Sequence, residues 1–270
     1  MANPVTKIIS GNNVKHGTMV THVTKKGETK TLSPVVDTLI SSAYKGRDLD
    51  DKFDNPRMFT GDSDGLQTTT TYTISTGADD GYATRSSSAS TVSTYNAGFR
   101  HTSSKEFVGV QDDEGTNDYY AAYFRFNNIV AEQGATVQSA YFKINKRGFH
   151  GNSADYDFYV AAYDADNQAA PTTAAGLNHS NYTTAQIAWG SNTDTGNGTI
   201  RSAANGTVLS SPDIKTAIQE VLDRAGWSSG NSIVIAFYSK AEQPGGYNQM
   251  VYVEMYDDSG DVPPQLEITI

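Results

Sequence analysis

Apolar and polar residues alternate with a period of two along much of the chain after about residue 68. The alternation is clearest in residues 120–127, 139–144, 251–256 and 266–270. Because successive side chains of a strand point to opposite faces, this spacing predicts half-buried β-strands. Residues 158–162 carry the same signal, and the continuous apolar run over 233–238 predicts a strand buried on both faces.

One segment breaks this period. Apolar residues recur there at helical spacing, after Ser211-Pro212-Asp213 and before Gly226: Ile214, Ala217, Ile218, Val221 and Leu222. Ser and Asp suit a helix N-cap, and glycine commonly follows a helix end. The spacing therefore predicts an amphipathic helix whose apolar stripe packs against a sheet.

The composition agrees with a strand-rich chain. The 270 residues include 16 tyrosines and 24 glycines, with abundant Ser, Thr, Asn and Asp. Tyr and Thr fit pleated surfaces, and Gly, Asn and Asp form turns. Many short strands joined by turns predict an all-β fold, a jelly-roll-type β-sandwich with one packed amphipathic helix and a short N-terminal arm.

The first residues read differently from the rest. Residues 5–32 predict short strands in a segment too polar to hold its own core, and Ser33-Pro34 predicts the start of a short helix. Residues 46–66 are turn-rich and predict a linker. We expect an N-terminal attachment arm over residues 1–60 and a β-sandwich domain over residues 61–270.

Charge divides along the same line. Residues 1–50 hold seven Lys and Arg against four Asp and Glu, a net charge of +3. Since the whole chain has a net charge of −10, residues 51–270 carry −13. An acidic body disfavours nucleic-acid binding. A basic arm predicts docking to an acidic partner, with solvated surface charge as the alternative. The candidate partner-binding residues are Lys7, Lys15, Lys25, Lys26 and Lys30.

Targeting signals are not evident. The N-terminus lacks the apolar stretch of a signal peptide, and no segment has the roughly 20 apolar residues of a membrane helix. We therefore expect no membrane partner and synthesis in a cytoplasm.

No group of residues predicts catalysis. Without cysteine there is no thiol nucleophile or disulfide. Residues 226–230 match G-x-S-x-G, but they follow a predicted helix and precede a strand, the reverse of a nucleophile elbow. The five histidines form no metal-ligand pair on a helix. Acidic turns at 62–65, 79–80, 112–114 and 257–258 offer oxygen ligands for a structural calcium, but none completes a calcium loop. We predict no catalytic residue, no metal site and no cofactor.

Several stretches, taken in order, resemble a known type of module. They are residues 74–81 (ISTGADDG), 123–144, 183–189 (TTAQIAW), 211–238 and 263–270 (PPQLEITI). This order is similar to the carbohydrate-binding-module-like β-sandwich domains of bacterial surface proteins and tailed-phage virion proteins. The resemblance covers about 200 residues and implies a jelly-roll sandwich that binds or cross-links. It assigns no binding residue.

These observations lead to three hypotheses. The first is a structural virion protein of a tailed bacteriophage, assembled in the host cytoplasm: a homo-oligomeric capsid decoration (cement) protein that docks on capsid proteins by its arm. The alternative is a tail- or fibre-associated protein that binds a host surface glycan, for which strand tyrosines such as Tyr141, Tyr159, Tyr252 and Tyr256 could supply stacking faces. A polysaccharide-degrading enzyme, with carboxylates brought together only in three dimensions, is the third.

Overall fold

The computed structural model describes residues 22–25, 28–31, 67–87, 93–101, 105–113, 116–151, 158–189, 200–239, 249–257 and 262–270. The chain divides into two compact units, Met1–Leu66 and Gln67–Ile270. Residues 32–66 lie outside the described residues, and so do the helix predicted after Ser33-Pro34 and the linker predicted over 46–66. The predicted boundary between residues 60 and 61 stays a prediction.

The described residues of the first unit form one antiparallel hairpin. Strand β1 (His22–Lys25) pairs with β2 (Glu28–Thr31), so that His22 lies opposite Thr31 and Lys25 opposite Glu28. Short strands were predicted for residues 5–32, and residues 26–27, where a turn was predicted, connect the pair.

The second unit is built from one antiparallel sheet, which contains twelve strands in the described part of the chain. The strands are β3 (Thr69–Thr73), β4 (Asp80–Ser87), β5 (Ala97–Arg100), β6 (Lys105–Asp113), β7 (Thr116–Phe126), β8 (Ser139–Gly151), β9 (Phe158–Tyr163), β10 (Tyr182–Ala188), β11 (Thr207–Ser210), β12 (Ile233–Ser239), β13 (Gln249–Glu254) and β14 (Gln265–Thr269). The main order is β10-β9-β12-β7-β6-β13-β8-β14-β3; β4 joins β5 to β7, and β11 pairs with β8.

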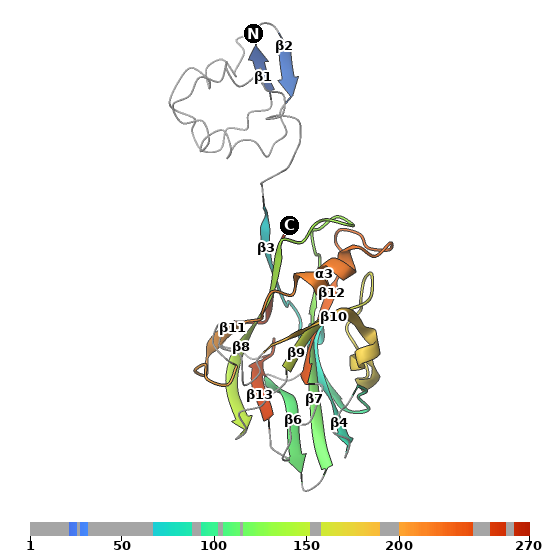
Figure 1. The fold of residues 1–270 in the computed structure, drawn as a ribbon, viewed down its shortest axis with the longest axis vertical. Helices are drawn as coiled ribbons and strands as arrows, with labels where there is room; N and C mark the ends of the chain where they lie inside the picture. The colour runs from blue at the N-terminus through green and yellow to red at the C-terminus, as the bar shows by residue number, and fades with distance from the viewer. Residues whose placement is uncertain are drawn as a thin grey trace. The chain divides into compact units, whose positions relative to one another are not determined.

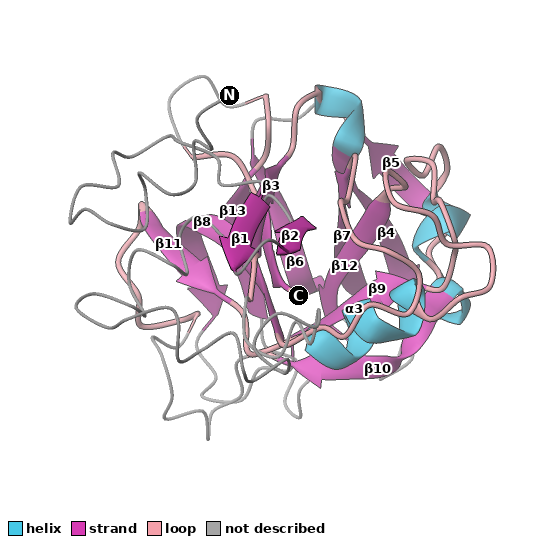
Figure 2. Ribbon diagram, turned by 90° about the horizontal axis from the view of Figure 1, so that it is seen from above, coloured by secondary structure: helices cyan, strands magenta, loops and turns pink. Residues whose placement is uncertain are grey.

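The sheet folds over at β7, which changes partner along its length. Residues 116–120 of β7 pair with β6, and residues 121–126 pair with β12. The ring of Phe124 in β7 lies 4.8 Å from that of Phe142 in β8, although β6 and β13 separate these strands along the sheet. The two halves of the sheet therefore face each other (Figures 1 and 2), and the predicted all-β sandwich with one packed helix is confirmed.

The space between the halves is filled by apolar side chains. Phe126, Phe142, Trp189 and Phe237 are buried there together with aliphatic residues of β8, β13 and β14. All seven residues of β12 are buried, as the continuous apolar run predicted. The alternation predicted for residues 139–144 is also confirmed, because Ala140, Phe142 and Ile144 are buried and the residues between them are partly exposed.

A second buried cluster covers the other face of β7, β9 and β12. It consists mostly of tyrosines and alanines, including Tyr119, Tyr123, Tyr163, Tyr182 and Tyr238. The strand predicted over residues 120–127 is present as part of β7, but the expectation that one of its faces is exposed was wrong for Ala121 and Tyr123, which are as fully buried as Phe124. The additional cover comes from residues 174–182, which include the 3-10 turns Ala174–Leu177 and His179–Asn181.

The predicted helix is present but shorter than expected. Helix α3 (Lys215–Leu222) packs against β8, β9 and β10 (Figure 2), and its buried side joins the inter-sheet core. The Asp213 carboxylate accepts hydrogen bonds from the backbone N–H groups of Lys215 and Ala140, so it caps the helix and also binds β8. The helix ends at Leu222, four residues before Gly226, and the Arg224 guanidinium in the following turn forms ion pairs with Asp164 and Asp166.

The sandwich has two distinct ends (Figure 1). The chain enters beside its own C-terminus, where Thr68 and Ile270 exchange backbone hydrogen bonds of 3.1 Å. At the opposite end, Ser87 pairs with Asn117, Asp113 with Thr116, and Gly151 with Gln249. The connections β4–β5, β6–β7, β8–β9 and β12–β13 therefore all leave from the end remote from residue 67.

Candidate functional site

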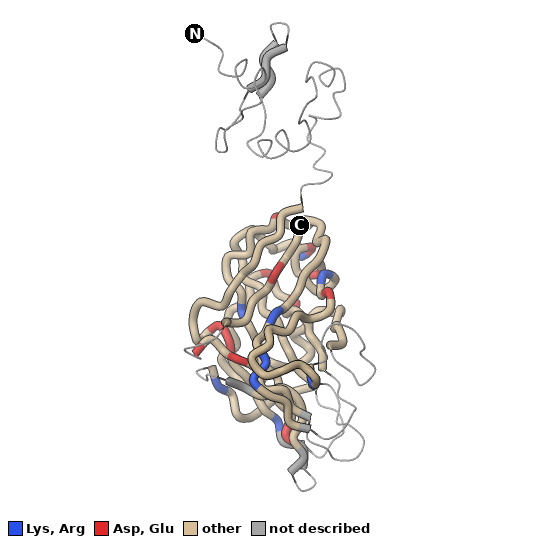
Figure 3. The backbone as a smooth tube through the Cα atoms, turned by 90° about the vertical axis from the view of Figure 1, so that its left-hand side faces the viewer, with Lys and Arg blue, Asp and Glu red and all other residues tan. Residues whose placement is uncertain are grey.

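A groove of about 620 Å³ opens on strands β8 and β13. Its lining consists of residues 146–150 of β8, Arg201 and residues 203–205 of the loop before β11, and Tyr252 of β13. Among the described residues of this lining there is no Asp or Glu, although the whole chain carries a net charge of −10. Figure 3 shows Lys and Arg scattered among acidic and uncharged positions, so a groove lined by Lys146, Arg147, His150 and Arg201 is a local exception.

A β-bulge shapes the groove. Lys146 lies opposite Val253 and Gly148 opposite Tyr252, which leaves Arg147 without a residue opposite it on β13. An extra residue of this kind bends the strand and changes the direction of its side chain. The Arg147 Nε forms an ion pair with the Oε1 of Glu254, a carboxylate that is only 1% exposed. Within the described residues the Glu254 carboxylate makes no further polar contact, so the ion pair with Arg147 is what compensates its buried charge.

Lys146 connects the two sides of the groove. This lysine is 2% exposed, and its Nζ donates to the carbonyl oxygens of Arg201 at 2.9 Å and Ala203 at 2.6 Å. Burial lowers the pKa of the Lys146 amine, because the charged form loses its hydration. The two carbonyl acceptors stabilise the ammonium and hold the loop before β11 against β8.

The arginine on the loop faces an aromatic ring. The guanidinium carbon of Arg201 lies 6.0 Å from the ring centroid of Phe149, within range of a cation–π interaction. Arg147, His150 and Arg201 are all exposed, whereas Phe149 and Tyr252 are half-buried. The groove thus presents three basic side chains next to apolar ring surface.

An aromatic row continues from Tyr252 across four strands. We use this name for Tyr82, Tyr120, Phe107 and Tyr252, which come from β4, β7, β6 and β13 and are all half-buried. Successive ring centroids lie 6.4 Å, 5.7 Å and 4.2 Å apart along this sequence. Such spacings are typical of packed aromatic pairs, and the partly exposed rings form a band that starts at the groove.

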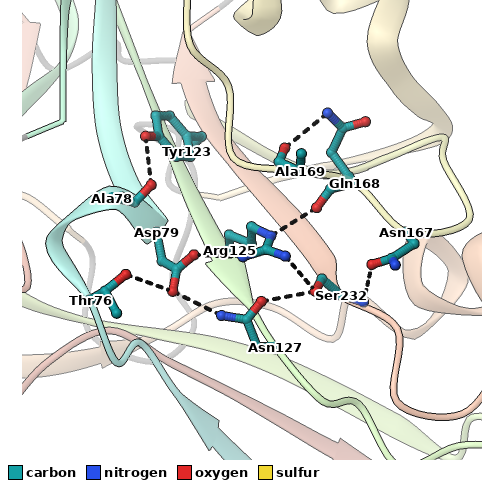
Figure 4. A network of polar contacts seen from close by, with 10 residues as sticks. All are labelled: Thr76, Ala78, Asp79, Tyr123, Arg125, Asn127, Asn167, Gln168, Ala169 and Ser232. Carbon is teal, nitrogen blue, oxygen red and sulfur yellow. Dashed lines mark hydrogen bonds and ion pairs between the residues drawn. The ribbon is translucent and has the colours of Figure 1, made fainter.

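A polar network on the tyrosine face of β7 is the other candidate (Figure 4). Asp79 is 4% exposed and accepts hydrogen bonds from Thr76, Arg125 and Asn127. The Ser232 hydroxyl accepts a hydrogen bond from Arg125 and donates one to the amide oxygen of Asn127. An amide oxygen is not a general base, so Asn127 would not activate Ser232 as a nucleophile.

The same network gives a structural role to residues 74–81 (ISTGADDG). The 3-10 turn Gly77–Asp79 runs directly into β4, and Asp80 accepts a 2.7 Å hydrogen bond from the backbone N–H of Tyr256. The Tyr123 hydroxyl donates to the carbonyl of Ala78. The two aspartates of ISTGADDG therefore anchor the start of β4 against β7 and the end of β13, a structural role.

The structure places only part of the residues predicted for partner binding. Lys25 lies at the end of β1 and Lys30 within β2, and nothing further is described of their side chains. Lys7, Lys15 and Lys26 lie outside the described residues. The lysine prediction therefore stays a prediction.

Other sequence motifs take structural positions where they are described. Residues 226–230 form the turn before β12, where Gly230 adopts a positive φ of 96° and the Trp227 indole donates to the carbonyl of Ala131. Among the described residues, no group of three or more His, Asp or Glu is placed to hold a metal ion. The acidic side chains of residues 62–65, 112–114 and 258 lie outside the description. No described helix is long and apolar enough to cross a membrane.

Sequence reasoning missed the groove. A signal was present, because residues 143–150 contain Lys143, Lys146, Arg147 and His150 in an otherwise acidic body. Arg201 and Tyr252 are more than 50 residues further along, and nothing in their local sequence connects them to this segment.

In comparisons with known proteins, the sequence matches no protein-family model and no curated protein. The function must therefore be inferred from the residues of this chain.

Proposed function

We propose that the protein is a non-enzymatic structural protein of a tailed-phage virion, a capsid decoration protein that docks by residues 1–60 and projects its β-sandwich. The observation that supports it most is the opposition of the two ends of the sandwich. The chain enters at the end where Thr68 pairs with Ile270, and four strand connections leave from the other end. A domain attached at one end and free at the other suits display on a particle surface.

The charge distribution supports the same proposal. The net charge of +3 over residues 1–50 is set against −13 on the rest of the chain. Docking by the basic segment on an acidic capsid surface leaves the acidic body repelled from that surface and directed outward. Repeated copies on a lattice make the homo-oligomeric arrangement natural.

The test is a particle-binding assay with purified capsids. Deletion of residues 1–45 is expected to abolish sedimentation with the particles, and circular dichroism should still report a folded β-protein. A full-length variant in which Lys7, Lys15, Lys25, Lys26 and Lys30 are changed to Gln should bind more weakly and with a smaller dependence on salt. Undiminished binding of the deletion variant would refute the proposal.

A second candidate is favoured by the groove and the aromatic row: a tail- or fibre-associated protein that binds a host surface glycan. Sugar rings stack on aromatic faces, and the half-buried rings from Tyr252 to Tyr82 form a band long enough for several of them. The groove lies in the part of β8 that approaches Gly151, at the end remote from residue 67.

A glycan array that includes envelope polysaccharides tests this candidate. Binding should be lost in the double variant Tyr252→Ala and Phe107→Ala and kept in Tyr141→Ala, a tyrosine on β8 outside the row. An array without any hit would remove the glycan-binding candidate and leave the capsid proposal untouched.

A further inference from the structure

We infer that the groove binds an acidic saccharide, a sugar chain that carries carboxylates, through Arg147 and Arg201 with the ring of Tyr252 as its apolar floor. The inference rests on the second candidate function and adds the chemical class of the ligand. Three features of the described residues support it: the charge of the lining, the fixed positions of the guanidinium groups, and the open face of one ring.

The charge of the groove selects for an anion. Arg147 and Arg201 are exposed and cationic, Lys146 adds a buried ammonium, His150 is exposed beside them, and no Asp or Glu is among the described residues of the lining. Glu254, the acid that pairs with Arg147, lies buried beneath it. A carboxylate entering the groove therefore meets exposed positive charge in a molecule that is negative as a whole. Planar guanidinium groups bind carboxylates through two parallel hydrogen bonds.

The two arginines are held before any ligand arrives. Glu254 fixes Arg147 from below, and the Phe149 ring lies beside Arg201. The hydrogen bonds from Lys146 to the carbonyls of Arg201 and Ala203 fix the loop on which Arg201 sits. Such restraint lowers the conformational entropy that binding has to overcome. Lys146 and Glu254 thus act as positioning residues.

Gly148 leaves the ring of Tyr252 open. The two residues are directly opposite each other on β8 and β13, and a Cβ atom added at Gly148 would lie 3.4 Å from Cδ2 of Tyr252. The three atoms nearest to such a Cβ all belong to the side chain of Tyr252, so a larger residue at this position would cover the ring. Glycine here gives a flat ligand access to the ring beside the cationic groups.

A single-stranded nucleic acid also offers anions and flat rings, but the observations favour a saccharide. A nucleic acid carries a phosphate at every nucleotide, and the body of this protein carries −13 beyond residue 50. The repulsion grows with each phosphate outside the groove. A saccharide with fewer charges and many hydroxyls places its carboxylates at the arginines and neutral sugar rings along the aromatic row.

Isothermal titration calorimetry on the full-length protein is the test. The probes are oligosaccharides of galacturonate, mannuronate, hyaluronan and polysialic acid, with methyl-esterified oligogalacturonate as the uncharged match, neutral cellohexaose, and oligo-dT. At least one carboxylate saccharide should bind. Loss of one charge-assisted contact in Arg201→Gln should weaken its binding about tenfold or more. Gly148→Val should weaken it similarly, although this variant keeps every cation.

Lys143→Gln is the matched control, because it removes a positive charge from the same strand outside the groove and should leave affinity unchanged. Equal binding by Gly148→Val and the parent protein would overturn the inference, since it would place the saccharide elsewhere. Tighter binding of oligo-dT would overturn it in favour of a nucleic acid. Binding of cellohexaose but of none of the acidic probes would refute the acidic groove and keep the glycan-binding function; no binding of any saccharide would refute both.

Discussion

Both faces of strand β7 contain fully buried residues, but the two faces are chemically different. On one face Ala122, Phe124 and Phe126 lie in the inter-sheet core among other Phe, Trp and aliphatic side chains. On the other face Tyr119 and Tyr123 belong to the tyrosine cluster, which Arg125 and Asn127 continue as the polar network of Figure 4. Every second residue thus meets a dry environment, and the residues between meet one that contains polar atoms.

This difference shows that burial is stabilised in two ways within one strand. The β7 residues of the inter-sheet face, Ala122, Phe124 and Phe126, need only matching volume, because their side chains have no polar atoms to satisfy. The tyrosine face needs hydrogen-bond partners as well: the hydroxyls of Tyr123, Tyr182 and Tyr238 donate to Ala78, Leu177 and Gln186. The second face should therefore respond to pH and to loss of single oxygen atoms, whereas the first should respond to loss of volume.

The largest expected effect is a loss of stability above pH 10. Burial raises the pKa of Tyr95, Tyr123, Tyr163 and Tyr182 well above the ordinary value of 10.0. In the unfolded chain these tyrosines lose their protons near pH 10, while the folded chain keeps them. The stabilisation by these protonated tyrosines is therefore fully present below pH 10. Above pH 10 the free energy of unfolding falls by about 1.4 kcal/mol per pH unit for each tyrosine.

Together the four groups should lower the free energy of unfolding by about 6 kcal/mol at pH 11. Urea unfolding between pH 8 and 11 measures it. In Tyr95→Phe the dependence of the free energy of unfolding on pH above pH 10 should be shallower by the contribution of one tyrosine proton. A flat profile over this range would contradict the burial of these hydroxyls.

The next largest effect is expected on the inter-sheet face. Phe124→Ala removes a fully buried ring that packs on Phe142, and the resulting cavity should cost about 3–5 kcal/mol in the free energy of unfolding. Chemical denaturation at pH 7 measures it, and the slope above pH 10 should not change. Val130→Ala, at a site 70% exposed, is the control and should stay within about 0.5 kcal/mol of the parent.

Asp79→Ala addresses the polar end of the tyrosine face. The change leaves Arg125 and Asn127 without their carboxylate acceptor, and because Arg125 is partly exposed we expect a loss of about 2–3 kcal/mol. Lys143→Ala removes an ion pair with Glu267 in which both side chains are about one quarter exposed, and should cost at most about 1 kcal/mol. Thermal unfolding of both variants compares them; equal losses would show that the network adds nothing beyond a surface pair.

The smallest effect separates two tyrosines of the same cluster. Tyr182→Phe leaves the carbonyl of Leu177 without its 2.6 Å donor and should cost about 1–2 kcal/mol. The Tyr95 hydroxyl has no hydrogen-bond partner within the described part of the chain, so Tyr95→Phe should be neutral or stabilising at pH 7. Urea midpoints at pH 7 distinguish them, and a larger loss in Tyr95→Phe would reverse our assignment.

Part of this fold could be predicted from local pattern. The strand over 139–144, the buried strand over 233–238 and the last strand were each predicted from the spacing of apolar residues, because side-chain direction in a strand depends only on position along it. The helix was predicted from its apolar stripe, but its last residue was not. The turn that follows the helix contacts residues about 60 positions away, because Arg224 pairs with Asp164 and Asp166, and local spacing carries no record of such contacts.

The candidate site could be predicted only in part. Its cationic segment on β8 is visible as a basic run, whereas Arg201 and Tyr252 reach it only through pairing of β11 and β13 with β8. The bulge at Arg147 depends on a register shift that no local pattern records. The lysines predicted to bind a partner remain a prediction.

The amino-acid sequence by itself determined that this chain is strand-rich, where most strands and the helix lie, and that its charge is uneven, because these properties follow from composition and short-range spacing. Only the tertiary structure decided that the tyrosine face of β7 is covered, and that Lys146, Arg201 and Tyr252 share one groove. Both depend on which distant segments pack together, and that choice is made by the summed contacts of the whole sandwich.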